Sequence, residues 1–131
     1  MKRIVVISFF LSSFFGLQAQ ISFKTIVPQK PIVVGESFQV QYAINGADKI
    51  TSFKAPSFEF FRFVNGPDLY IGNADGVKGS QPVKNYVFTL EAFRPGYFII
   101  HGAAALLDGK IYGSNQVRVK VISKEEAANR Y

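Results

Sequence analysis

The fold class of this chain follows from one stretch, SFQVQYAI at residues 37–44. Every second side chain in it is apolar, and most of those between are polar. Successive side chains of a β-strand point to opposite faces, so this period of two predicts a strand with one buried face. The apolar positions are Phe38, Val40, Tyr42 and Ile44.

The same alternation returns in YVFTLE at residues 86–91 and in VRVKV at residues 117–121. Turn-forming residues separate the apolar runs at spacings of about 8–12 residues, and no segment after residue 19 has the period of a convincing amphipathic helix. We therefore predict an all-β fold, an antiparallel immunoglobulin-like β-sandwich of about seven strands, with a small barrel as the alternative. The cysteine and tryptophan signature of antibody domains is absent, so the likeness concerns architecture alone.

Short sequences rich in Gly, Asn, Asp and Pro mark the expected turns. NGP at residues 65–67 is expected to end the apolar run at residues 58–64. DG at residues 75–76 and at residues 108–109 is typical of hairpin tips. The apolar run at residues 97–107 is expected to form one strand before the second of these hairpins.

The first nineteen residues predict a secretory signal peptide. Lys2 and Arg3 precede an apolar run at residues 4–15, and Ala19 provides a small residue for cleavage. This run is shorter than the roughly 20 residues that a membrane helix needs. We expect cleavage after Ala19, with an uncleaved anchor or a buried strand as the alternative.

The remaining chain is predicted to form one domain at residues 20–122, followed by a polar tail or linker start at residues 123–131. Ser123 is a suitable cap for one helical turn in this tail, since Glu125 and Glu126 stand near its start.

The composition limits how this domain is held together and what it binds. The chain contains no cysteine, which excludes disulfides and thiolate metal sites, so aromatic side chains, drawn from the 14 Phe and 6 Tyr residues of the whole chain, must supply the packing. Loss of Lys2 and Arg3 with the signal lowers the formal net charge from +6 to +4. The remaining cations are scattered and form no block, which argues against a nucleic-acid partner.

The sequence predicts no catalytic residue, no cofactor-binding residue and no metal ligand. His101 is the single histidine, and nothing in the sequence singles out a nucleophile and an acid to act with it. Asp68, Asp75 and Asp108 lie in turn-like segments and lack the spacing of a calcium loop. The glycines of residues 72–79 lack the Gly-Lys-Ser/Thr ending of a phosphate-binding loop.

A group of phenylalanines around Pro56 is the candidate partner-binding segment. Proline cannot donate to a central ladder, which places Pro56 at an edge or a bend. The aromatic side chains either plug the end of the sandwich or form an exposed apolar patch for a partner. These residues are Phe53, Phe58, Phe60, Phe61 and Phe63.

Three tyrosines support an alternative function. Tyr70, Tyr97 and Tyr112 would form a sugar-stacking surface if their rings met on one face. The alternative is therefore a cell-surface glycan-binding module of immunoglobulin-like fold.

Taken together, the motifs of the chain resemble the first N-terminal domain of BatD proteins, which belong to the Bat (aerotolerance) system. Each motif alone is unspecific, and their order and spacing over residues 21–122 carry the resemblance. The motifs are VGESFQVQY at 34–42, APSF at 55–58, FRFV at 61–64, YVFTL at 86–90, PGYFII at 95–100, GKIYGSN at 109–115 and the valine strand at 117–121.

The resemblance implies an exported bacterial protein of the kind found in Bacteroidetes. BatD proteins carry several β-sandwich domains outside the cytoplasmic membrane and then a membrane helix. This sequence has one such domain before Tyr131. We expect either a piece of a longer membrane-anchored protein or a short periplasmic relative that reaches the membrane through partners.

The resemblance also implies a role without catalysis. The expected function is protein–protein interaction or scaffolding in an envelope complex linked to oxygen tolerance. The expected partners are envelope proteins, including von Willebrand A-domain proteins of the same system. We expect no nucleic-acid partner and no membrane span in the mature chain.

Overall fold

The computed structural model describes residues 21–73 and 82–130. The predicted signal peptide and the predicted hairpin tip at residues 75–76 lie outside these residues. The described part contains ten strands, one 3-10 turn and one α-helix. They are β1 (Phe23–Ile26), β2 (Ile32–Val33), β3 (Ser37–Asn45), η2 (Ala47–Lys49), β4 (Ile50–Lys54), β5 (Phe61–Asn73), β6 (Pro82–Ala92), β7 (Gly96–Ile100), β8 (Ala104–Leu107), β9 (Lys110–Gly113), β10 (Val117–Ile122) and α1 (Lys124–Arg130).

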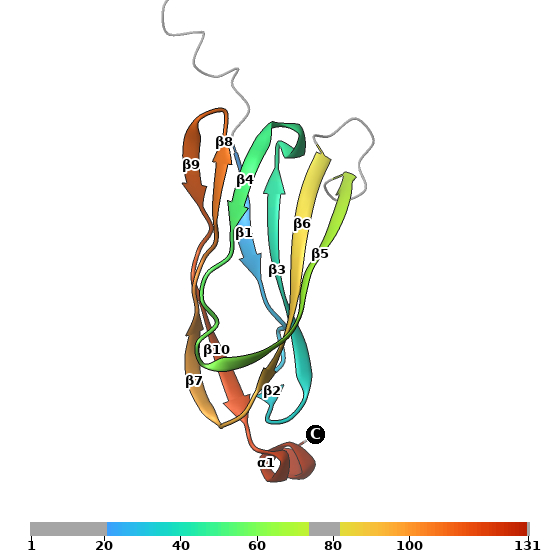
Figure 1. The fold of residues 1–131 in the computed structure, drawn as a ribbon. Coiled ribbons are helices and arrows are strands. Elements are labelled where there is room, and N and C mark those ends of the chain that lie inside the picture. Colours follow the sequence, from blue (N-terminus) through green and yellow to red (C-terminus); the bar gives the residue numbers. More distant parts are fainter. Residues whose placement is uncertain (1–20, 74–81, 131) are drawn as a thin grey trace, which may run out of the picture.

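The strands form two packed layers (Figure 1). One layer is a four-stranded sheet in the order β1-β3-β6-β5, and the other consists of two three-stranded sheets, β2-β10-β7 and β4-β8-β9. The pairings are antiparallel except that of β2 with β10, which is parallel. The all-β antiparallel sandwich predicted from the sequence is therefore confirmed.

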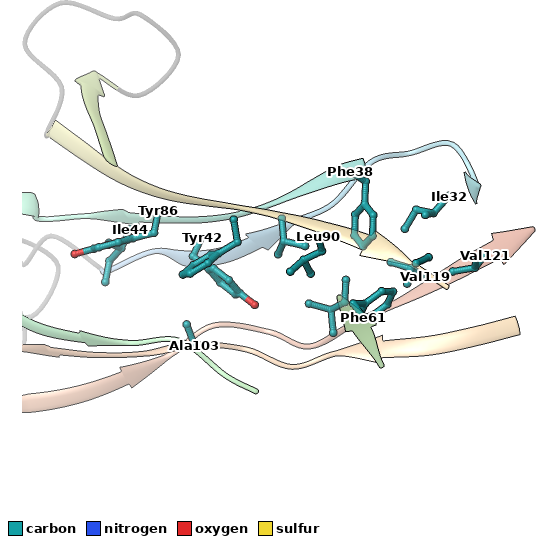
Figure 2. Packing of buried hydrophobic residues seen from close by; sticks show 14 of the residues in the cluster. Ile32, Phe38, Tyr42, Ile44, Phe61, Tyr86, Leu90, Ala103, Val119 and Val121 are labelled. Carbon is teal, nitrogen blue, oxygen red and sulfur yellow. The ribbon is translucent and has the colours of Figure 1, made fainter. Parts of the chain in front are cut away.

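The core lies between the layers, and its centre is the apolar face of β3. Val40 and Tyr42 have no exposed surface, and Leu90 on the neighbouring β6 is equally buried. Phe38 meets Phe61 edge to face, with ring centroids 5.3 Å apart. Figure 2 shows Phe38, Tyr42 and Leu90 pointing into the space between the layers. The period of two read from the sequence thus identifies the face that the fold buries.

Two short elements raise the number of strands above the predicted seven. β2 has two residues and β4 has five, too few for alternation to be read. The run at residues 97–107, predicted as one strand, is two strands. β7 ends at Ile100 and pairs with β10, whereas β8 begins at Ala104 and pairs with β4 and β9. The chain crosses between the two small sheets in this gap.

The prediction that NGP at residues 65–67 ends a strand is wrong. These residues lie within β5, which continues to Asn73. The register against β6 shifts between Phe63 and Asn65 and again between Asn65 and Asp68. Bulges therefore accommodate the turn-like residues without ending the strand.

Two local predictions from the sequence are confirmed. Asp108 and Gly109 have φ angles of 48° and 81°, and they connect β8 to β9 as a tight hairpin. The backbone N–H of Glu126 donates to Oγ of Ser123 over 3.0 Å, so Ser123 caps the helix at its N-terminus. Helix α1 runs for seven residues, longer than the expected single turn.

Candidate interaction surface

Strand β5 forms one edge of the four-stranded sheet. It pairs with β6 on one side and with no described strand on the other. In Figure 1 its last residues lie at the margin of the large sheet, on the far side of β6 from β3. Five of the nine exposed large hydrophobic residues of the described chain belong to it. We call these the β5 surface: Phe63, Val64, Leu69, Tyr70 and Ile71.

Part of this surface belongs to the inner face of the sheet. Leu69 pairs with Tyr86, and residues directly opposite in an antiparallel pair share a face. Tyr86 is 5% exposed and faces the other layer, whereas Leu69 is 53% exposed. Ile71 lies on the same face as Leu69 and is 66% exposed. Side chains in core-facing positions are thus left open to solvent at this end of β5.

The second layer explains this exposure. Its nearest strand, β4, is the edge of the sheet β4-β8-β9. The Phe53 ring of β4 stacks on the Tyr86 ring of β6, with centroids 3.7 Å apart and planes 6° apart. β4 therefore covers β6, and the layer stops one strand short of Leu69 and Ile71.

In the middle of β5, the segment at residues 64–67 shifts the register against β6 and brings the backbone close to Phe88. Gly66 has a φ of 133°, and a Cβ there would come within 2.9 Å of the Phe88 backbone. Only glycine fits so close to the neighbouring strand. After this segment, Asp68–Asn73 pairs with β6 without another register shift.

The backbone of Asp68–Asn73 is open on its outer side. Within residues 21–73 and 82–130, its hydrogen bonds all go to β6, including a long contact of 3.5 Å from Asn85 Nδ2 to the Tyr70 carbonyl. Natural sheet edges are usually blunted by charges, proline or bulges. Here those features lie before Leu69, and LYIGN at residues 69–73 has none of them. An unblunted apolar edge is a template for a further strand.

A charged pair links the first half of β5 to β6 on the outer face of the sheet. Arg62 Nε and Nη2 lie 3.1 and 3.2 Å from the two carboxylate oxygens of Glu91 on β6. Hydrogen bonding to this carboxylate, together with its charge, raises the pKa of Arg62. The open part of β5 therefore begins beyond this pair.

The predicted partner-binding phenylalanines do not lie on one surface. Phe53, Phe58 and Phe60 are partly buried against the core. The Phe58 ring lies 5.3 Å from Phe88, and the Phe60 ring lies 5.6 Å from Phe98. These three side chains plug the space between the layers, which is the first of the two readings of the sequence.

Phe61 and Phe63 stand two residues apart on β5 and differ sharply in the exposure of their side chains. Phe61 is 7% exposed and meets Phe98 of β7 edge to face at 5.8 Å. Phe63 is 52% exposed, and its ring lies 6.4 Å from that of Phe88. Binding of a partner by the predicted segment stays a prediction, and Phe63 is the member that reaches the β5 surface.

The other residues singled out in the sequence lie apart. His101 is exposed, and its carbonyl accepts a hydrogen bond of 2.9 Å from the Tyr42 hydroxyl. Tyr70, Tyr97 and Tyr112 lie on β5, β7 and β9, which belong to three different sheets. No group of three or more His, Asp or Glu side chains within the described ranges could hold a metal ion.

An open hollow of about 610 Å³ lies between α1 and β2, lined by residues such as Val33, Ile122 and Ala127. Among the residues the structure describes, no helix is both long and apolar enough to cross a membrane.

Sequence reasoning missed Leu69 and Ile71 as surface residues. They stand in an apolar run with Tyr70, which predicts a strand without telling which faces are covered. The absence of a charge or proline in residues 69–73, read together with the turn-forming residue types that follow in the sequence, was the available signal for an open edge.

Comparison with known proteins gives the family of the chain. A family model described as the BatD DUF11-like domain matches residues 25–121. No curated protein matches the chain. The match covers 97 of the 131 residues, from Thr25 to Val121, and includes both layers of the sandwich and the whole of β5. The chain therefore belongs to the BatD family.

Proposed function

We propose that this BatD-family chain is a non-enzymatic, exported interaction module that scaffolds a protein complex of the bacterial envelope. The observation that carries the proposal is the open half of β5. Asp68–Asn73 combines a free backbone edge with apolar side chains that stand more than half exposed on a core-facing side. A partner that adds a strand here satisfies the backbone and covers the apolar side chains in one step.

The exposed side chains of β5 support a particular chemistry for the proposed partner strand. The side chains of the partner strand that point inward must be apolar, because they cover Leu69 and Ile71. The side chains that alternate with them on the partner strand point outward, to the same side of the sheet as Tyr70. If the partner strand runs antiparallel to β5, apolar and aromatic side chains opposite Leu69 and Ile71 stabilise the pair. The partner is thus an extended protein segment with apolar side chains at alternate positions.

Membership of the BatD family supports the place of this partner. Proteins of this family are associated with the cell envelope, and the amino-terminal sequence of this chain has the pattern of an export signal. We propose von Willebrand A-domain proteins of the Bat system as the partners and oxygen tolerance as the process they serve.

The test is affinity capture from the detergent-solubilised envelope of the bacterium that encodes the chain, read by mass spectrometry. The wild-type chain is compared with Leu69→Ser/Ile71→Ser. A matched control, Ile26→Ser/Ile111→Ser, replaces two exposed isoleucines on other strands, which are 43% and 78% exposed. Far-ultraviolet circular dichroism and thermal melting establish that all three chains fold.

We expect the wild type and the control to enrich a von Willebrand A-domain protein at least tenfold over beads alone. The β5 variant should lose that enrichment while its melting temperature stays within a few degrees of the wild type. Retention of the same partner by the β5 variant, or its equal loss in the control, would contradict the proposal.

A further inference from the structure

A second surface lies on the other layer of the sandwich and is positively charged, whereas the β5 surface is apolar. Arg118 and Lys120 alternate along β10 with Val119, which is 5% exposed. Since Val119 points into the core, the two cations point outward. Lys120 pairs with Tyr97 of β7, so Tyr97 shares this outer face and is 58% exposed.

The aromatic ring organises the cations. The Arg118 guanidinium carbon lies 4.2 Å from the centroid of the Tyr97 ring, and Lys120 Nζ lies 6.0 Å from it. Contact with the ring face orients the guanidinium and leaves its N–H edge free to donate. This pre-orientation suits a carboxylate, which accepts two parallel hydrogen bonds from such an edge.

A third cation stands beside them. Lys30 lines an open hollow of about 230 Å³ together with Arg118 and Lys120. We call Lys30, Tyr97, Arg118 and Lys120 the basic face. In the described part of the chain, none of its three cations forms an ion pair. The segments that build it, residues 27–31, β7 and β10, contain no Asp or Glu.

We propose that the basic face binds an acidic polypeptide segment, with Arg118 holding a carboxylate and Lys30 and Lys120 pairing with its neighbours. Charge complementarity supports this binding, because Lys30 and Lys120 stand beside the oriented guanidinium of Arg118 and none of the three forms an ion pair with a described residue. A membrane surface is the weaker fit, since lipid-binding clusters typically contain about four to eight Lys or Arg residues. The inference does not depend on β5, which belongs to the other layer.

The experiment measures fluorescence anisotropy of a fluorescein-labelled poly-glutamate peptide titrated with the folded chain at low salt. Poly-glutamine of the same length serves as the neutral probe. The test variant is Arg118→Gln/Lys120→Gln. Its matched control, Lys54→Gln/Lys110→Gln, removes the same charge from exposed positions of β4 and β9. Arg118→Lys separates charge from the planar guanidinium.

The proposal expects the test variant to bind poly-glutamate at least tenfold more weakly, which corresponds to about 1.4 kcal/mol. The control variant should stay within twofold of the wild type, and Arg118→Lys should fall between them. Added salt should weaken binding, because exposed charges are screened.

Three results would overturn the proposal. The first is equal binding by the wild type and Arg118→Gln/Lys120→Gln. The second is an equal loss in the control variant, because net charge alone would then explain binding. The third is tight binding to phosphatidylglycerol vesicles, sensitive to the test variant, without binding to the peptide, because a lipid surface would then be the ligand.

Discussion

Strands β1 and β5 are the two edges of the same four-stranded sheet, and only one of them is closed. At β1, the Thr25 backbone N–H donates to Oδ1 of Asn115 over 3.0 Å. The Thr25 hydroxyl donates to the Asn115 carbonyl and lies 2.8 Å from Oγ of Ser114. Thr25 is 7% exposed, the one buried polar residue among those described. Hydrogen bonds from the segment after β9 thus cover this edge.

The closed side also depends on a close approach of backbones. Oγ of Ser114 accepts a hydrogen bond of 2.8 Å from the Ala103 N–H. A Cβ at the neighbouring Gly102 would lie 2.0 Å from the Ser114 carbonyl oxygen. At β5, by contrast, a Cβ built on Gly72 has no atom of the described residues within 4 Å, its chain neighbours apart. One edge of the sheet is covered by hydrogen bonds from Ser114 and Asn115, whereas no described strand pairs with the outer side of the other edge.

Exposure on β5 is therefore set by the extent of the second layer and not by the strand itself. Phe61 lies under Phe98 and is buried, whereas Leu69 and Ile71 have no strand above them. The same strand therefore serves the core at one end and the surface at the other.

The largest expected effect separates those two ends of β5. Phe61→Ala should lower the free energy of unfolding by about 3–5 kcal/mol, because it leaves a cavity in the core. Phe63→Ala should lower it by less than about 1 kcal/mol, since half of that side chain already meets water. Urea denaturation of both variants measures the difference. Similar losses would mean that β5 is covered along its whole length.

The same glycine-to-alanine substitution should lower stability on the closed side of the sandwich and leave it nearly unchanged on β5. Gly102→Ala should cost about 1–3 kcal/mol, because the Ser114 backbone must move away from the new methyl group. Gly72→Ala should change stability by no more than about 0.5 kcal/mol, since the position is open. Melting temperatures compare the two variants, and tolerance of Gly102→Ala would show that the closed side is loose.

The smallest effect concerns Tyr42, whose hydroxyl donates to the His101 carbonyl beside Gly102. Tyr42→Phe should cost about 1 kcal/mol at pH 7, the usual net value of one hydrogen bond. Burial raises the pKa of Tyr42 above its ordinary value of 10.0. The folded state therefore keeps this proton after the unfolded state has released it.

The sign of the pH dependence follows from that difference in pKa. The contribution of Tyr42 is complete below about pH 10 and is lost as the pH rises toward the pKa of the folded state. Urea denaturation at pH 7 and pH 11 should find the gap between wild type and Tyr42→Phe smaller at the higher pH. A gap that stays constant would contradict the assigned burial.

Much of the fold could be predicted because local patterns dictate it. The alternation at residues 37–44 identified the buried face of β3, and Ser123 identified the cap of α1. NGP at residues 65–67 misled because its local preference for a turn is outweighed by pairing with β6 on both sides of the bulges. The family resemblance stated from the motifs is also confirmed.

The candidate surface could not be predicted in the same way. Exposure of Leu69 depends on where the β4-β8-β9 sheet ends, which no local pattern encodes. The phenylalanines of residues 53–63 illustrate the converse, because their crowding in sequence is equally compatible with a core and with a patch. For Phe53, the stacking of its ring on Tyr86 in the structure decides in favour of the core.

We propose above that the outer edge of Asp68–Asn73 is a docking site for a partner strand. Amide hydrogen exchange of the chain, free and bound to its captured envelope partner, tests this most directly. The account predicts slow exchange at the Thr25 amide in both states, fast exchange at alternate amides of Asp68–Asn73 in the free chain, and strong protection of these amides in the complex. Protection elsewhere with no change in Asp68–Asn73 would contradict it.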